Sequence, residues 1–237
     1  MAMAGDSRNR RPVGIPMSGA MRLELLEELL RRRDMDQAAR SKLASAPPGR
    51  SKDAFVRVQQ IDAENAAWLR NALKPGYWLG RTFVGEEGSH AAWLLAQHAD
   101  RDPELQQHCL KLLAKAVAEG EASPGDLAFL TDRVLLASGQ NQVYGTQLGV
   151  RDGYLVACRL RNPDTVDERR ESVGLEKLET YLARARELFG TPSPARIICP
   201  NCLAEIETWL PELGGRSVVE CASCHTVHTI RPCIRKT

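Results

Sequence analysis

The sequence predicts a mainly α-helical protein: a multi-helix domain followed by a small β zinc-ribbon module. Apolar residues recur at helical spacing through the first 190 positions, proline and glycine separate these runs, and two Cys-x2-Cys pairs stand near the C-terminus. We expect a flexible N-terminal tail (1–17), a helical domain (18–190), a proline linker (191–195) and the zinc ribbon (196–237).

The first helix is expected to begin near Gly19 with Ser18 as its cap, because leucines then recur three and four residues apart. The segment 34–45 continues it as a second helix or as a bent extension. Two prolines and a glycine in 46–52 end the pattern. Residues 53–73 are helical again.

Three more helices follow. The first covers about 86–99. The second opens with Asp102 as cap and proline in the first turn, and the third opens with Ser123 in the same way and runs to about 137. Residues 139–163 form a loop with a short strand at GYLVAC, and 164–189 is helical with an interruption at Gly174.

Bulk composition is that of a globular protein, with 43% hydrophobic and 26% charged residues and a formal net charge of +2. The apolar runs are too short to span a bilayer, and the basic N-terminus lacks the apolar core of a secretory signal. We therefore expect a cytoplasmic protein that keeps its thiols reduced and has no membrane partner. Charges are nearly balanced from Arg196 onward, which disfavours nucleic acid as a partner.

The four cysteines Cys199, Cys202, Cys221 and Cys224 have the spacing of a four-cysteine zinc site. Two cysteines on each tight turn can aim their thiolates at one point, and four thiolates close the shell, so the Zn²⁺ is structural. A segment of this size has too little core to fold without the metal. Iron in the same cage, a redox pair or packing cysteines are the alternatives, and His225 or His228 could replace a ligand.

The other three cysteines have simpler interpretations. Cys109 lies on the apolar stripe of its helix and is expected in the core. The apolar setting of Cys158 favours packing over a nucleophile, and Cys233 is expected to be a spare thiol.

Four ordered segments carry a resemblance: DQAAR (36–40), GEEGSHAAWLLAQHADRDPELQQ (85–107), LAFLTDRVLLASGQNQVYGTQ (127–147) and NPDTVDERRESVGLEKLETYL (162–182). With their QHAD, DR and YGTQ motifs they resemble one uncharacterised bacterial family, a helical domain of unknown function. The resemblance implies a helical fold and no established activity. The zinc ribbon is not a feature of that family and looks like an appended module.

Polar residues within apolar helices and in the loop after them are the candidates for chemistry, since burying such groups requires partners. A histidine near an aspartate can act as general base, and an arginine with amides can bind a carboxylate or phosphate. The catalytic candidates are His98, Asp100, Asp132, Arg133 and Tyr144, and the substrate-binding candidates are Gln142, Thr146 and Gln147.

Each candidate also has a structural interpretation. His98 could cap the end of its helix, Asp100 or Asp102 the next one, and Asp132 with Arg133 could form ion pairs that fix the loop 139–147. A metal site from His90, His98 and a carboxylate is geometrically feasible but lacks a supporting motif.

Two functions follow from these patterns. One is a zinc-containing protein whose helical domain holds a polar ligand-binding or catalytic pocket for a small molecule or peptide, with hydrolase or group-transferase chemistry if it is an enzyme. The other is a non-enzymatic adaptor whose ribbon binds a partner protein.

Overall fold

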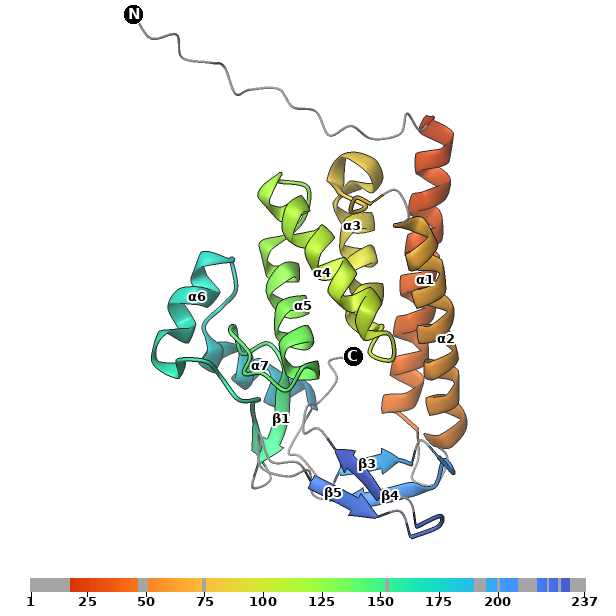
Figure 1. The fold of residues 1–237 in the computed structure, drawn as a ribbon, viewed down its shortest axis with the longest axis vertical. Coiled ribbons are helices and arrows are strands. Elements are labelled where there is room, and N and C mark those ends of the chain that lie inside the picture. The colour runs from red at the N-terminus through yellow and green to blue at the C-terminus, as the bar shows by residue number, and fades with distance from the viewer. Residues whose placement is uncertain are drawn as a thin grey trace, which may run out of the picture.

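A computed structural model of the chain is mainly α-helical (Figure 1). It describes residues 18–46, 51–73, 76–151, 154–189, 195–199, 201–208, 217–220, 222–225 and 227–230. The predicted N-terminal tail, most of the proline linker, Cys221 and Cys233 lie outside these residues, as does the side chain of His228.

Helices α1 (Gly19–Ala44) and α2 (Ser51–Ala72) form a long antiparallel pair (Figure 1). The predicted cap is present, because Ser18 Oγ accepts a hydrogen bond from the Met21 amide at 3.2 Å. The expected bend or second helix at 34–45 was wrong. The sequence has no proline or glycine between Met21 and Ala44, so nothing interrupts the hydrogen-bond ladder of α1.

Helix α3 (Arg81–His98) packs against both members of this pair and begins earlier than the sequence predicted. Gly85 has φ +71° inside it, a conformation that favours glycine and marks a kink. Gly88 allows the close approach to α1, since a Cβ atom there would lie 2.9 Å from Leu26 Cδ1. A glycine at this position therefore leaves room for α1 to pack closely against α3.

Helices α4 (Pro103–Ala118) and α5 (Pro124–Ala137) open as predicted. The side chain of Asp102 accepts from the Leu105 amide at 3.1 Å, and Ser123 Oγ accepts from the Asp126 amide at 3.4 Å. Proline occupies the first helical turn in both, where no backbone N–H is needed.

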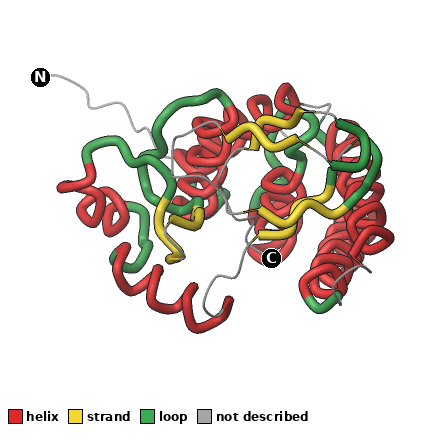
Figure 2. The backbone as a smooth tube through the Cα atoms, turned by 90° about the horizontal axis from the view of Figure 1, so that it is seen from below, coloured by secondary structure: helices red, strands yellow, loops and turns green. Residues whose placement is uncertain are grey.

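The main core lies among α1 to α5, whose helices are seen bundled together in Figure 2. It is built from leucines, alanines and two tryptophans, with Cys109 fully buried among them, as predicted. The ring of Trp78 packs in this core, and its indole N–H donates a hydrogen bond to Ser89 Oγ at 3.2 Å. Burial of the apolar helix faces is what stabilises the bundle.

A smaller α/β unit follows. Strands β1 (Leu148–Arg151) and β2 (Tyr154–Ala157) pair antiparallel, and a 3₁₀ turn η1 (Pro163–Thr165) leads into α6 (Val166–Ser172) and α7 (Leu178–Phe189). The predicted strand and the interruption at Gly174 were correct, whereas the partner strand β1 was not predicted. The second core cluster consists of Leu148, Leu155, Tyr181, Leu182 and Ala185.

Two antiparallel hairpins follow toward the C-terminus. β3 (Ala195–Ile198) pairs with β4 (Glu205–Thr208), and β5 (Ser217–Glu220) pairs with β6 (Val227–Ile230). Both hairpins lie in the segment expected to form the small β module. Cys199 and Cys202 lie between β3 and β4, and Cys224 lies between β5 and β6.

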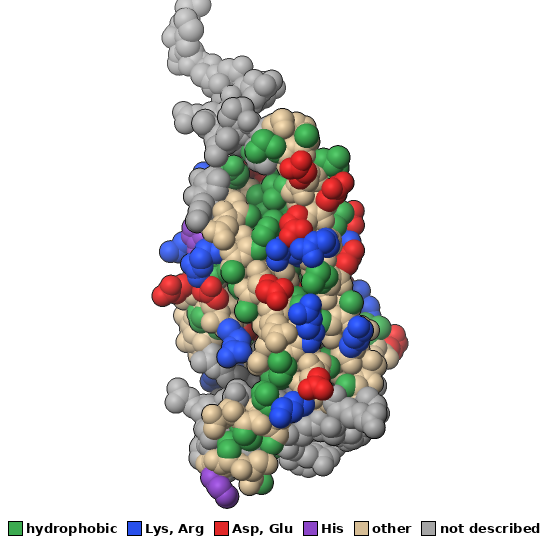
Figure 3. Space-filling view, turned by 90° about the vertical axis from the view of Figure 1, so that its right-hand side faces the viewer, with side chains coloured by type: hydrophobic (Ala, Val, Ile, Leu, Met, Phe, Trp, Pro, Cys, Tyr) green, Lys and Arg blue, Asp and Glu red, His purple; other side chains and the backbone are tan. Residues whose placement is uncertain are grey.

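The face over α1 and α2 carries basic and acidic side chains intermixed (Figure 3). Some of these are paired along α1, where Glu28 accepts from Arg31 and Arg32. Within the described parts of the chain, no helix combines the length and apolarity needed to cross a membrane.

Candidate functional site

Four ionisable side chains from three helices meet in the interior: Asp36 and Arg40 of α1, Asp62 of α2 and His98 of α3. All four are more than nine-tenths buried. Arg40 Nε lies 3.0 Å from Asp36 Oδ1, and its Nη2 donates to Asp62. His98 Nδ1 lies 2.9 Å from Asp36 Oδ2. We call this group the buried ionic cluster.

The hydrogen-bond partners of His98 determine which of its ring nitrogens carries the proton. Arg40 Nε is also 3.1 Å from His98 Nδ1, but the carboxylate of Asp36 is the stronger acceptor for that N–H. His98 then carries its proton on Nδ1 and donates it to Asp36, which leaves Nε2 as an acceptor. Nε2 of His98 makes no hydrogen bond to any residue that the structure describes.

Burial and pairing set the charges in the buried ionic cluster. Burial lowers the pKa of His98 and outweighs the hydrogen bond to Asp36, which would raise it. For Asp36, burial alone would raise the pKa, yet the hydrogen bond from His98 and the nearby charge of Arg40 hold it below its usual value. Near neutral pH the cluster therefore contains an ionised Asp36 and a neutral His98.

Asp132 anchors the loop after α5. Its Oδ1 accepts from the Val143 amide at 2.6 Å, and its Oδ2 accepts from both the amide and the hydroxyl of Thr146 at 3.0 Å. The amide of Tyr144 donates to the same carboxylate. Burial raises the pKa of Asp132, and these hydrogen bonds oppose the rise. The contacts hold backbone rather than face a cavity.

Arg133 ties that loop to the end of α3. Its Nη1 donates to Gln147 Oε1 at 2.8 Å, its Nε to the Gln97 carbonyl at 3.2 Å, and it forms an ion pair with Asp100 at 2.9 Å. Gln142 is fully buried and bridges the carbonyls of Gln147 and Cys158.

The structure thus divides the predicted site residues. Asp100, Asp132, Arg133, Gln142, Thr146 and Gln147 form one connected loop-anchoring network. Tyr144 joins it through its backbone amide and carbonyl. His98 belongs instead to the buried ionic cluster, and His90 pairs with Asp126 at 3.0 Å on the surface, so the two histidines do not share a site.

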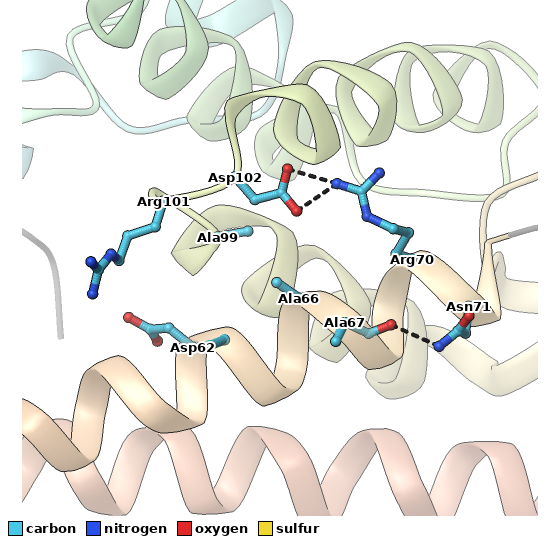
Figure 4. Close-up of a pocket in the computed structure, with 9 residues that line it drawn as sticks. Asp62, Ala66, Ala67, Arg70, Asn71, Ala99, Arg101 and Asp102 are labelled. Carbon is cyan, nitrogen blue, oxygen red and sulfur yellow. Dashed lines mark hydrogen bonds and ion pairs between the residues drawn. The ribbon is translucent and has the colours of Figure 1, made fainter.

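A pocket of about 440 Å³ opens between α2 and the α3–α4 junction. Figure 4 shows its floor of alanines, with Arg101 beside Asp62 at one end and the Arg70–Asp102 ion pair at the other. The alanines that line it are Ala63, Ala66, Ala67 and Ala99.

Asp62 belongs to both the pocket and the buried ionic cluster. Its carboxylate lines the cavity and also accepts from Arg40, which in turn contacts Asp36 and His98. The pocket is therefore connected to the buried histidine through Asp62 and Arg40. An apolar floor with a few convergent polar groups is the usual make-up of a small-molecule site.

A second candidate site lies in the C-terminal hairpins. The sulfurs of Cys199, Cys202 and Cys224 lie within 4.8 Å of one another, and Cys199 Sγ is 3.6 Å from Cys224 Sγ. With a Zn–S distance of about 2.3 Å, the edge of a tetrahedral site is about 3.8 Å. Three sulfurs thus stand where one metal ion could bind them. Cys221, the fourth predicted ligand, lies outside the described residues.

The two cysteine turns share a backbone feature. Leu203 directly follows Cys202 and has φ +61°, and His225 directly follows Cys224 and has φ +54°. A left-handed residue at this point reverses the chain after the second thiolate. The two turns therefore have the same backbone conformation after their second cysteine, although neither has the glycine that this conformation favours.

The two other described cysteines are not reactive sites. Burial raises the pKa of the Cys109 thiol to about 12. Cys158 is buried and disulfide-bonded, so it does not offer a free nucleophile, and the expectation that all thiols are reduced was wrong for this residue.

Comparison with known families separates the two candidate sites. Residues 23–192 match a family of unknown function (DUF6624), which is well over half the chain. The chain belongs to DUF6624. No curated protein and no solved structure matches it.

The DUF6624 region contains the buried ionic cluster, the loop-anchoring network and the pocket, whereas the cysteine turns lie beyond it. The resemblance read from the sequence to an uncharacterised helical domain is thereby confirmed at the level of the family.

Sequence reasoning missed Asp36, Arg40 and Asp62 as site residues. A signal for two of them exists, because Asp36 and Arg40 stand seven and eleven residues after Leu29, on the same buried face of α1. Charged residues on a core-facing stripe require buried partners. Asp62 has the weaker signal of a carboxylate directly after the core residue Ile61.

Proposed function

We propose that the DUF6624 domain of this protein is a small-molecule binding domain, with the pocket between α2 and the α3–α4 junction as its site. The observation that carries this proposal is that Asp62 joins the pocket to the buried ionic cluster. Burying two carboxylates, a guanidinium and an imidazole is costly unless they are well paired, and helix packing alone does not require them.

Binding is favoured over catalysis because the lining side chains are not those of a reaction centre. His98 stands behind Asp62 and does not line the pocket. The hydrolase or group-transferase alternative requires a ligand that reaches Nε2 of His98. Asp132 and Arg133, its predicted helpers, are engaged with the loop 143–147 instead.

A pocket-filling variant tests this proposal. Ala67 lines the pocket but is exposed, so Ala67→Trp should fill the cavity without disturbing the core. Ala114→Trp places the same side chain on an exposed part of α4 away from the pocket and serves as the control. A fragment library screened by ligand-observed NMR should give hits that Ala67→Trp loses and Ala114→Trp keeps. Hits retained equally by both variants would argue against this site.

We also propose that the C-terminal hairpins bind one structural Zn²⁺ through Cys199, Cys202, Cys221 and Cys224. The closeness of three sulfurs and the equivalence of the two turns support it. Asn201 adds an outer contact, because its Nδ2 lies 3.7 Å from Cys224 Sγ on the opposite turn. Four thiolates would fill the coordination shell and leave no position for a substrate, so the role of the metal is to stabilise the fold.

Metal analysis tests the zinc proposal. The purified protein should contain about one zinc per chain. Cys202→Ser should release it and unfold the hairpins alone, with the helical circular dichroism preserved. Cys109→Ala, which removes a thiol from the helical core, should keep the metal. A zinc-loaded Cys202→Ser protein, or a wild type without metal, would contradict the proposal. A protein partner for the ribbon and a cytoplasmic location stay predictions.

A further inference from the structure

We infer that the interface between α3 and α5 binds one internal water molecule, held between the indole N–H of Trp93 and the side-chain oxygen of Gln97. This site is separate from the pocket and from the cysteine turns, so it depends on neither proposed function. Two buried polar atoms without partners, one helical turn apart on α3, carry the inference.

The two atoms belong to side chains that are almost completely buried. Trp93 is 8% exposed and Gln97 is 6% exposed. Trp93 Nε1 and Gln97 Oε1 are themselves buried, and neither has a hydrogen-bond partner among the residues that the structure describes. A buried donor or acceptor without a partner is costly, and folded proteins rarely leave one so. Each atom therefore needs a partner that these residues do not supply.

Helix α3 brings the donor and the acceptor together. Residues four apart in a helix lie on the same face, with their Cβ atoms about 5–6 Å apart. Trp93 Nε1 and Gln97 Oε1 do not bond to each other. A single water molecule can accept from the indole N–H and donate to the amide oxygen, so it satisfies both atoms at once.

Contacts with α5 close this part of α3 on both sides. His90 stacks on Trp93 with ring centroids 4.7 Å apart at one side, and the Gln97 carbonyl accepts from Arg133 Nε at 3.2 Å at the other. Between them, Trp93 meets Phe129 edge-on, with ring centroids 5.8 Å apart. A guest here must be small and should exchange slowly. Polar partners favour water over an empty space, which is stable only where its walls are apolar.

NMR of the full chain tests for this water directly. Water held inside a protein gives NOE and ROE cross-peaks of opposite sign, whereas surface water and chemical exchange give the same sign in both spectra. The indole proton of Trp93, assigned by its loss in Trp93→Phe, should show the opposite signs. Equal signs, or no cross-peak with water, would overturn the inference.

A variant identifies the second partner of the water. Gln97→Met removes the amide oxygen and keeps the length of the side chain, so the Trp93 cross-peaks should disappear. Gln107→Met makes the same change on an exposed part of α4 and should leave them unchanged. Cross-peaks that survive in Gln97→Met would come from exchanging ring protons of His90 and would contradict a water held by Gln97.

A crystal structure of the wild type gives a test that needs no variant, should Gln97→Met fail to fold. One water within hydrogen-bond distance of both Trp93 Nε1 and Gln97 Oε1 is the expected result. A direct hydrogen bond between the two side chains, or an interface without electron density between them, would overturn the inference.

Discussion

His98 Nδ1 lies 2.9 Å from the carboxylate of Asp36, although the two residues are 62 positions apart in the chain. The contact joins α1 to α3 inside the core and is shared with Arg40. A buried ion-pair group of this kind stabilises only while every member is present, because any partner left alone is a charge without solvation.

Asp36→Asn should therefore destabilise the protein by about 3–5 kcal/mol, the usual effect of removing one member of a buried pair. Urea unfolding followed by circular dichroism measures this. The control is Asp34→Asn on the same helix, whose side chain is 67% exposed and pairs with its neighbour Arg33, so its effect should stay below about 1 kcal/mol. Equal effects of the two variants would show that the cluster does not contribute to stability.

Two histidines should give opposite pH dependences. Burial lowers the pKa of His98, so below about pH 6.5 the unfolded chain takes up a proton that the folded chain does not. The free energy of unfolding of wild type should exceed that of His98→Gln by less and less as the pH falls from 7.5 to 5.5. The free energy of unfolding at each pH measures it, and a difference that grows toward low pH would mean that His98 is charged in the fold.

His90 is the opposite case. Its hydrogen bond to Asp126 raises its pKa, so its contribution is fully present below about pH 6.5 and is lost as the pH rises through the folded value. The stability that wild type has over His90→Gln should therefore grow as the pH falls. The same titration checks it, and a pH-independent difference would show that the surface pair is not formed in solution.

Asp132→Asn should loosen the loop that follows α5. The variant keeps the shape of the side chain but replaces one acceptor oxygen by a donor facing backbone N–H groups, which should destabilise by about 2–3 kcal/mol. Hydrogen exchange by NMR should show reduced protection at the amides of Val143 and Thr146. Unchanged protection would place the anchor of this loop elsewhere.

Local signals predicted much of the fold. Serine and aspartate before proline located the starts of α4 and α5, and glycines located the end of α5 and the break between α6 and α7. These signals depend on a few neighbouring residues, so they can be read from the sequence. The start of α3 could not be predicted in this way. A glycine in the left-handed conformation usually ends a helix, whereas α3 continues through Gly85.

The site was less predictable because its partners are distant in sequence. The sequence placed His98 and Asp132 among polar groups in need of partners, but it could not show that Asp132 contacts backbone amides while His98 contacts Asp36. Likewise Arg101 and Asp62 become neighbours only through the packing of α2 against the end of α3. The cysteine spacing was readable because the ligands of each pair are local.

Leu203→Gly should preserve or raise zinc affinity. Leu203 has φ +61°, a conformation that costs a residue with a side chain about 1–2 kcal/mol and that glycine adopts freely. Leu203→Val, whose branched Cβ suits this conformation less well, should weaken binding. Competition with a colorimetric zinc chelator gives both affinities. Tighter binding by the valine variant than by the glycine variant would contradict the equivalence of the two turns.

The location of a bound ligand tests the central claim most directly. With ¹⁵N-labelled protein and a library hit, chemical-shift changes should concentrate at the amides of Ala63, Ala67, Ala99 and Arg101, and they should disappear in Ala67→Trp. Changes centred instead on the loop 143–147 or on the cysteine turns, with the α2 amides unmoved, would contradict the account.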